Sequence, residues 1–421
     1  MSFAQQMGPV SGGSLAAGAV APILPSNGVQ LSDGALLHGG ISVEGGYDSN
    51  IFYTNDSTRL GSAVLRVTPF VDLTNTARNG EVPSGLFFDL RASLGYREYL
   101  SSNSNITRLR AFTPTANVNI EHNSNGTLAL GFSDTYVRVQ DAPYTETGVN
   151  DDIIIRNDNI ALAQLRWSPG GGRLQSILRL TNTLDWFDTA ALKAGNSMTN
   201  EAMVDVSWRW LPKTALYLQV RQGYVVYLNN DDASGLVANG ADGKNSSFPL
   251  RAVIGIRGLI TEKTSISLGL GYQNAFYSSG ATTGGFWGST TAAGELVILP
   301  IFATKITFGV HHDFQNSVVG NFFYDDGAYA SLAHQTVARL VGQLWAGYDH
   351  RRYYGLPGST DARIDDLIQA TASVDFYLKP WAYVGLSYML AHNSSDYLPN
   401  MNLSGTNYTK HQIFARVGFT Y

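Results

Sequence analysis

The sequence predicts an all-β fold, a transmembrane, antiparallel, up-and-down β-barrel of about eighteen strands. Three observations support this prediction. Apolar and polar residues alternate with a period of two along most of the chain, which places them on opposite faces of strands. The connections between these segments alternate between short and long. Charged residues are only 14% of the chain and the mean hydropathy is -0.07, yet no run of about 18 apolar residues could form a spanning helix.

The first residues carry no strand pattern. Met1 to Ala4 lacks a basic n-region and an apolar core, but Ser2-Phe3-Ala4 before Gln5 resembles the end of a signal-peptide cleavage site. Residues 5–37 are rich in Gly, Ala, Ser and Pro. We therefore expect a flexible periplasmic arm over residues 1–37, with a signal-peptide remnant at 1–4, and the barrel over residues 38–421. A partial plug of the lumen is the alternative role for the arm.

The barrel region divides into segments of regular alternation. In 86–97, Leu90 and Ala92 fall on one face, and Asp89 and Arg91 fall on the other. Segments 106–120, 126–139 and 319–332 alternate poorly, so sixteen strands is the alternative count. The predicted strands are 39–47, 61–74, 84–99, 106–120, 126–139, 154–167, 173–187, 199–211, 214–228, 247–259, 263–277, 287–299, 303–315, 319–332, 336–352, 364–378, 381–393 and 408–421.

Two kinds of connection separate the predicted strands. One set is short and holds turn residues, as in 168–172 and 211–214. The other set is longer and acidic or rich in Asn and Gly, as in 140–153, 229–246 and 394–407. Outer-membrane barrels have short periplasmic turns and long extracellular loops, so the sequence predicts this orientation. An even number of strands then places both termini on the periplasmic side.

Aromatic residues gather near the predicted strand ends, as two belts that match the two interfaces of a membrane. The last segment, 411–421, alternates strictly and ends on an aromatic residue. It resembles the closing strand of bacterial outer-membrane barrels, in which the terminal aromatic belongs to the signal read by the barrel-insertion machinery. An edge strand of a soluble sheet is the alternative. The candidates for that signal are Val417, Phe419 and Tyr421, and the candidate interface residues near the short turns are Trp167, Trp208, Trp210, Trp381 and Tyr421.

The opening of the barrel region carries a family resemblance. Residues 46–52 read GYDSNIF and residues 65–69 of the next predicted strand read LRVTP. This arrangement resembles the start of the β-barrel porin family of Gram-negative bacteria, and the up-and-down pattern extends the resemblance over about 39–421. The resemblance implies a place in the bacterial outer membrane and contact with its lipid and lipopolysaccharide. A homo-oligomer is compatible with it, since porins are often trimeric, but no strand pattern marks a subunit interface. The resemblance supplies no catalytic residues.

Alternation places more basic than acidic side chains on the inner face of the predicted barrel. A barrel of 16–18 strands leaves an aqueous channel, and its low-dielectric wall focuses a basic excess, which favours small anionic solutes. The alternative is that the pairs Asp89/Arg91, Asp205/Arg209 and Arg179/Asp185 only brace the wall. The candidate lumen charges are Arg91, Arg166, Arg179, Arg209, Arg221, Arg251, Arg257, Arg339 and Arg416, with the acids Asp89, Asp205 and Asp375.

Motifs for other chemistry are sparse. The chain has no cysteine, P-loop, Rossmann fingerprint, zinc motif or nucleophile elbow, so the sequence predicts neither an enzyme nor a cofactor. A net charge of -5 argues against a nucleic-acid partner. His311 and His312 fall on opposite faces of a strand and cannot chelate one ion together. Clustered acids are weak calcium candidates, with solvated loops as the alternative. They are Asp231, Asp232 and Asp242, and similarly Asp325-Asp326 and Asp365-Asp366.

The predicted function is therefore an outer-membrane channel for the passive passage of small, preferentially anionic solutes. Two alternatives stay open. The first is the outer-membrane conduit of a polysaccharide export system, in which the inward aromatics Tyr217, Trp345 and Tyr383 would form a sugar-stacking track. The second is a structural or surface-array barrel with a blocked lumen.

Overall fold

The computed structural model describes the strands and most of the short turns. The described residues are 28–32, 34–77, 81–141, 153–189, 193, 195–229, 246–277, 288–301, 303–317, 322–336, 339–354, 363–396 and 407–421. Most of the N-terminal segment that we assigned to the arm, residues 1–27, lies outside these ranges.

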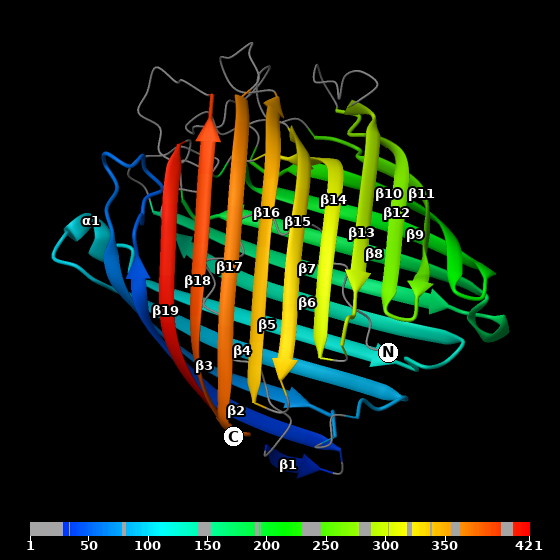
Figure 1. Cartoon of the computed structure of the whole chain (residues 1–421), viewed down its shortest axis with the longest axis horizontal. Helices are drawn as coiled ribbons and strands as arrows, with labels where there is room; N and C mark the ends of the chain where they lie inside the picture. The colour runs from blue at the N-terminus through cyan, green and yellow to red at the C-terminus, as the bar shows by residue number, and fades with distance from the viewer. Residues whose placement is uncertain are drawn as a thin grey trace.

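Strands β2 to β19 form one closed sheet (Figure 1), which confirms the prediction of an eighteen-strand antiparallel barrel. Each strand pairs with the next along the chain, and β19 pairs with β2 to close the barrel. The strands are β2 (Ala35–Asp48), β3 (Ser62–Thr74), β4 (Leu86–Leu100), β5 (Ala111–His122), β6 (Leu128–Asp141), β7 (Ile154–Trp167), β8 (Leu174–Phe187), β9 (Ser197–Leu211), β10 (Thr214–Tyr227), β11 (Leu250–Thr261), β12 (Thr264–Asn274), β13 (Thr290–Ile298), β14 (Thr304–Asn316), β15 (Phe322–Thr336), β16 (Leu340–Tyr354), β17 (Arg363–Lys379), β18 (Ala382–Ser395) and β19 (Tyr408–Thr420).

A short additional strand, β1 (Val29–Ser32), lies outside the closed sheet. It pairs with Leu36 and Leu37 of β2, whereas the pairing of β19 with β2 runs only as far as Gly40. β1 therefore covers the part of the β2 edge that β19 does not reach. Strand structure thus includes residues 29–32 and 35–37, which the sequence predicts to belong to the arm.

The clearest difference from the predicted strands lies at 106–120. A helical turn, α1 (Ser104–Thr107), and a bend precede β5, which begins only at Ala111. The Asn103 side chain caps α1 by accepting a hydrogen bond from the N–H of Asn105 at 2.9 Å. The segment alternates poorly because its first residues are not extended. Within the described ranges, no helix combines the length and the apolarity needed to cross a bilayer.

The two faces of the sheet differ in polarity. On β16, Leu344 points outward and is 52% exposed, while its neighbour Gln343 points into the lumen. Large apolar side chains cover the outside in the same way on most strands. Examples are Ile254, Leu270, Val310, Leu386 and Ile413. An apolar surface of this extent is stable in hydrocarbon but not in water, so the outer face is the face that contacts lipid.

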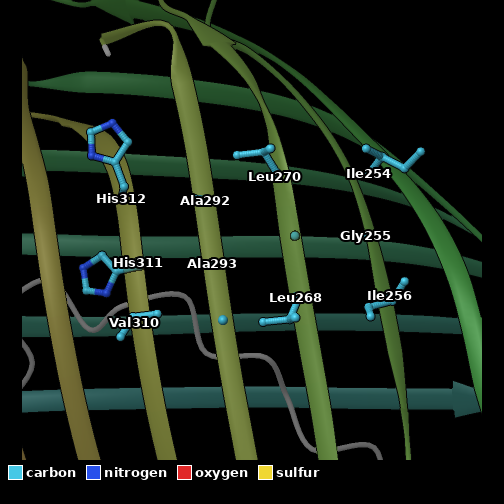
Figure 2. A pocket seen from close by; sticks show the side chains of 12 residues that line it. Ile254, Gly255, Ile256, Leu268, Leu270, Ala292, Ala293, Val310, His311 and His312 are labelled. Carbon is cyan, nitrogen blue, oxygen red and sulfur yellow. The ribbon is translucent and has the colours of Figure 1, made fainter.

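Small residues leave a shallow hollow in the outer wall of β11 to β14 (Figure 2). In the strand register, Ala292 and Gly294 of β13 lie between Leu268 and Leu270 of β12 and Val310 of β14. The hollow has a volume of about 540 Å³. Its lining is mostly apolar, like the rest of the outer face.

The GYDSNIF segment lies where the barrel closes. Asp48, at the end of β2, forms an ion pair with Lys410 of β19 at 3.0 Å, and both side chains are 2% exposed. Asn50 donates a hydrogen bond from Nδ2 to the carbonyl of Thr409 at 3.1 Å. The segment that resembles the porin family therefore joins the first barrel strand to the last.

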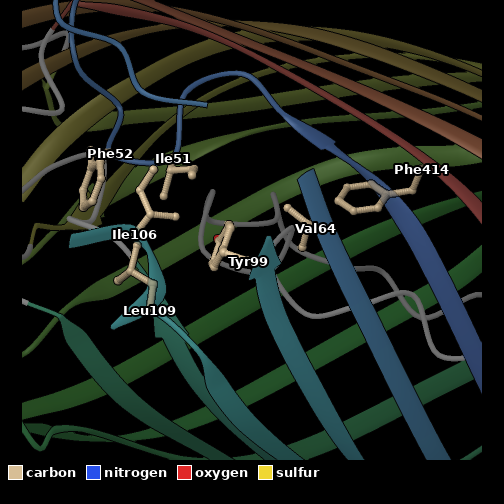
Figure 3. Close-up of a cluster of buried hydrophobic side chains, with 7 residues drawn as sticks. All are labelled: Ile51, Phe52, Val64, Tyr99, Ile106, Leu109 and Phe414. Atoms are coloured by element: carbon tan, nitrogen blue, oxygen red, sulfur yellow. The ribbon is translucent and has the colours of Figure 1, made fainter. Parts of the chain in front are cut away.

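A buried apolar cluster holds two extracellular connections against the wall (Figure 3). Ile51 and Phe52 come from the connection after β2, and Ile106 and Leu109 come from α1 and the bend that follows it. The full cluster is Ile51, Phe52, Val64, Tyr99, Ile106, Leu109 and Phe414. These connections are therefore packed parts of the barrel rim.

Candidate functional site

Three arginines lie in line across the lumen wall, and we call them the arginine row: Arg179 of β8, Arg221 of β10 and Arg251 of β11. In the antiparallel register, Arg179 is opposite Met203 of β9, Met203 is opposite Arg221, and Arg221 is opposite Arg251. Residues directly opposite one another in a sheet project from the same face. The row therefore runs across the inner wall, perpendicular to the strands.

Two members of the arginine row are held by neutral amides. Arg179 donates to Oε1 of Gln164 from Nε at 3.2 Å and from Nη2 at 2.9 Å. Arg221 donates from Nε to Oε1 of Gln219 at 3.0 Å. An amide orients a guanidinium group without neutralising it. Both arginines therefore keep their positive charge on the lumen side.

Other predicted lumen arginines are paired with acids. Arg251, the third member of the row, lies 3.0 Å from the Asp313 carboxylate. Arg257 lies 2.6 Å from Asp205, and its guanidinium stacks over the ring of Tyr217 at 4.8 Å. These contacts brace neighbouring strands and reduce the charge that the lumen experiences.

Two of the pairs suggested by the sequence are replaced by others among the described residues. Asp205 pairs with an arginine of β11 rather than with Arg209, and Asp185 is held by Arg156 at 2.8 Å rather than by Arg179. Residues four or six apart on one strand are separated by about 13 or 20 Å, whereas cross-strand neighbours are about 5 Å apart. Partners on other strands are therefore closer.

A buried paired cluster joins β17 and β19 to β2 and β3. Arg416 donates from Nε and Nη2 to the two oxygens of Asp375 at 2.8 and 2.5 Å. Glu44 lies 3.7 Å from Arg66, whose guanidinium stacks over the Phe414 ring at 4.1 Å. This part of the wall is braced by charge pairs, as the bracing alternative expects.

Arg91 and Asp89 of β4 lie beside a second buried group. Asp72 of β3 is the register partner of Arg91, and His38 Nδ1 lies 3.5 Å from the Asp72 carboxylate. The Arg91 guanidinium stacks over the Phe70 ring at 4.7 Å. The group is embedded in the wall, so it too serves to brace strands.

The remaining predicted lumen arginines lie toward the short turns. Arg166 donates a hydrogen bond to the carbonyl of Ser124 in the turn between β5 and β6. The backbone N–H of Arg209 bonds to the carbonyl of Arg173 at 2.8 Å, next to the turn between β7 and β8. Arg339 is exposed just before β16. These three arginines lie near the rim of the barrel that carries the short turns.

The predicted interface aromatics lie at or next to strand ends on the side of the short turns. All are exposed to the surroundings: Trp167 by 46%, Trp208 by 43%, Trp210 by 58%, Trp381 by 46% and Tyr421 by 68%. Trp381 stacks on Phe419 with ring centroids 6.2 Å apart, and Val417 lies on the same outer face of β19. Contact with the membrane interface and with the insertion machinery stays a prediction for these residues.

The three aromatics of the predicted sugar track are dispersed over β10, β16 and β18. Tyr217 is covered by Arg257, as described above. Tyr383 is only 3% exposed and packs against Phe70 and Tyr377. A stacking surface needs ring faces that are open to the lumen, and Tyr383 does not offer one.

Sequence reasoning missed a charged group in the upper wall, near the extracellular rim. Arg363 and Asp365 form a bidentate pair and are each 2% exposed. Arg351 lies 3.6 Å from Asp325, which is also 2% exposed. We had considered both aspartates as members of solvated acidic runs beside loops. The strand register pairs Asp325 with Arg351, and Arg351 with Asp365. Acidic and basic residues at matching positions of neighbouring strands were the signal for this group. The other calcium candidates, Asp231, Asp232 and Asp242, lie outside the described residues.

A closed eighteen-strand barrel with an apolar outer surface and a polar, charged interior defines the class of the protein: a transmembrane β-barrel of the outer-membrane type. In a closed sheet, the backbone N–H and C=O groups of each strand can bond to the neighbouring strands. A span through hydrocarbon needs this, because no water is present there to bond to them.

Comparison with solved structures returns barrels of bacterial outer-membrane proteins. The chain is similar to the siderophore receptor PirA from Pseudomonas aeruginosa, with a TM-score of 0.44 and 7% identity over 91% of this chain and 80% of that chain. It is also similar to Acinetobacter baumannii OccAB3, with a TM-score of 0.45 and 8% identity over 91% of this chain and 99% of that chain. For Pseudomonas aeruginosa OpdQ, the TM-score is 0.44 and the identity is 8%, over 91% of this chain and 98% of that chain. No protein-family model and no curated protein matches the chain. The assignment to the class therefore depends on the barrel itself.

Proposed function

We propose that the protein is a transport channel rather than an enzyme, and that small solutes diffuse passively through its lumen with anions preferred over cations. Barrels of 16–18 strands are wide enough to leave an aqueous passage. The arginine row is the observation that carries the preference. Arg179 and Arg221 are oriented by Gln164 and Gln219, so their charge is fixed in place but not cancelled.

The preference for anions has an electrostatic cause. Charges at the edge of a water-filled passage through a low-dielectric wall produce a focused potential, which raises the local concentration of counter-ions. The paired clusters around Arg416 and Arg91 contribute little to this potential, because each lies beside carboxylates. Arg251 is likewise offset by Asp313, so the preference comes mainly from Arg179 and Arg221, which have no ion pair within 4 Å among the described residues.

The proposal is tested by single-channel recording of the purified full chain in planar bilayers with a KCl gradient. We expect open steps and a reversal potential that indicates chloride preference. In the double variant Arg179→Glu with Arg221→Glu, the sign of the reversal potential should change, because the row becomes acidic. Arg339→Glu is the matched control and should leave the reversal potential close to that of the wild type, because Arg339 lies outside the row.

The other outcomes decide between the alternatives. Equal reversal potentials in the wild type and the double variant would contradict the anion preference. A barrel that shows heat-modifiable migration on a detergent gel but no conductance would contradict the channel and favour a structural barrel with a blocked lumen. Channel currents that soluble polysaccharide blocks, and that small anions do not affect, would favour the export conduit.

A further inference from the structure

Three side chains of metal-binding type meet on the lumen face of β14, β15 and β16. His311 is opposite Gly327 in the register, and Gly327 is opposite Asp349. Asp325 lies two residues before Gly327 and so projects from the same face. His312, the next residue of β14 after His311 (Figure 2), belongs to the opposite face and is not part of the group. We call His311, Asp325 and Asp349 the lumen triad.

Gly327 makes room for the lumen triad. A Cβ atom at this position would lie 2.2 Å from Cε1 and 2.6 Å from Nε2 of His311, and 2.4 Å from Oδ1 of Asp349. Any other residue at position 327 would therefore push the imidazole and the carboxylate apart. The backbone of β15 acts as the floor on which the side chains from β14 and β16 converge.

The spacing within the lumen triad suits a shared ion better than direct hydrogen bonds. His311 Nε2 lies 3.7 Å from Oδ2 of Asp325 and 3.8 Å from Oδ1 of Asp349, and the three ligand atoms all lie within 4.8 Å of one another. These distances exceed those of hydrogen bonds. Two ligands of a tetrahedral zinc ion are separated by about 3.4 Å, given bonds of about 2.0–2.1 Å.

The burial of these side chains also favours a shared ion. His311 Nε2, which faces the two carboxylates, is buried and forms no hydrogen bond with the described part of the chain. The Asp325 side chain is only 3% exposed, whereas those of His311 and Asp349 are 16% exposed. An ion can therefore reach the group from the lumen, and water can complete its coordination. A buried polar atom without a partner is costly, and a bound cation would remove that cost.

Arg351 lies on the far side of the two carboxylates. It is 3.6 Å from Oδ1 of Asp325 and 3.6 Å from Oδ2 of Asp349, which are the oxygens directed away from His311. One oxygen of each carboxylate thus contacts the guanidinium, and the other contributes to the lumen triad. Outer contacts of this kind orient the ligands of metal sites. With a neutral imidazole, two carboxylates and one guanidinium leave a net charge of -1, which attracts a cation.

We propose that the lumen triad binds one divalent first-row transition ion, with His311 Nε2, Asp325 Oδ2 and Asp349 Oδ1 as ligands. One imidazole and two carboxylates match zinc and its neighbours in the periodic table. Calcium prefers six to eight oxygen ligands and magnesium prefers an octahedral oxygen shell, so both fit this set less well. The proposal concerns the wall of the barrel and does not depend on which solute passes through it.

The test is isothermal titration of the refolded, chelator-treated full chain in detergent with Zn²⁺ alone. We expect one saturable equivalent in the wild type. His311→Gln and Asp349→Asn should each weaken its affinity by about 10-fold or more, in line with the loss of a ligand or of its support. The visible absorption of Co²⁺ bound to the wild type should have the intensity of a low-symmetry, four-coordinate site, and both variants should lose it.

His312→Gln is the matched control, because His312 is adjacent in sequence but faces the other way and bonds to Asp326. It should bind Zn²⁺ as the wild type does. Folding of each variant is checked by heat-modifiable migration, and if His311→Gln does not fold, Asp349→Asn decides alone. Absence of a saturable equivalent in the folded wild type would overturn the proposal, as would equal affinity in the wild type and the ligand variants. Loss of binding in His312→Gln alone would place the ion on the outer face and would also overturn it.

Discussion

Most buried charges in the lumen wall are matched by an oppositely charged partner, usually from another strand. Arg416 with Asp375 and Lys410 with Asp48 are examples in which both partners are at most 10% exposed. Removing a charge from water costs several kcal/mol per ion, and only a close, well-oriented partner offsets this. Arg179 and Arg221 depart from this pattern, since amides hold them, and this is why they stand out as functional candidates.

The pair of Arg416 and Asp375 allows a stability prediction at this scale. Arg416→Ala should lower the free energy of unfolding by about 3 kcal/mol, because it leaves the Asp375 carboxylate buried without its partner. Reversible unfolding in urea, followed by tryptophan fluorescence in lipid vesicles, measures this change. The double variant Arg416→Met with Asp375→Leu should recover most of the loss. If the single variant were as stable as the wild type, the pair would not be a structural brace.

At the scale of strands, the seam between β19 and β2 is the contact on which closure depends. Asp48 and Asn50 link the two strands at the extracellular end, and the hydroxyl of Ser49 accepts a hydrogen bond from the N–H of His411 at 2.8 Å. Gly46 lies in the same seam. A Cβ atom there would be 2.0 Å from the carbonyl oxygen of Ile413. The seam therefore requires a residue without a side chain at position 46.

A matched pair of glycine variants tests the seam. Gly46→Ala should lower the free energy of unfolding by about 1–3 kcal/mol, because the added methyl group forces β2 away from β19. Gly45 is the control: a Cβ atom there would meet nothing within 4 Å, since the residue faces outward. Gly45→Ala should therefore fold as the wild type does. The folded fraction after dilution from urea into detergent, read as heat-modifiable migration, measures both. Equal folding of the two variants would argue against a tight seam.

For the whole molecule, the decisive property is that one sheet separates hydrocarbon from water. Closure removes the free edges of β2 to β19, so the backbone groups of these strands can pair with neighbouring strands instead of facing lipid. The outer face is mostly apolar, and most of the ion pairs lie on the inner face. The alternation of apolar and polar residues along each strand therefore matches a sheet with hydrocarbon on its outer face and water on its inner face.

Neighbouring residues of β16 test this separation. Leu344→Arg should lower the free energy of unfolding by about 2–4 kcal/mol, because it places a charge in the hydrocarbon. Gln343→Arg places the same side chain in the lumen, and it should change the free energy by less than about 0.5 kcal/mol. Urea unfolding in lipid vesicles measures both. Similar losses in the two variants would contradict the assignment of the faces.

The sequence by itself determined the class of fold, because alternation with period two and the lengths of the connections are local properties. Even so, it misplaced the start of β5, where Asn103 caps a helical turn that competes with the strand. It also predicted the face on which each lumen arginine lies, since the face of a residue follows from its parity within the strand. The role of these charges in the lumen stays a prediction.

Only the tertiary structure decided which charges meet. The partner of Asp205 is Arg257 rather than Arg209, and Asp325 meets Arg351 instead of lying in solvent. The arginine row and the lumen triad exist because the register brings residues of different strands into line. Register is set by the pairing of whole strands and the closure of the barrel, which no single segment encodes. Parity along a strand is local and can be read directly, whereas proximity between strands is a property of the closed sheet.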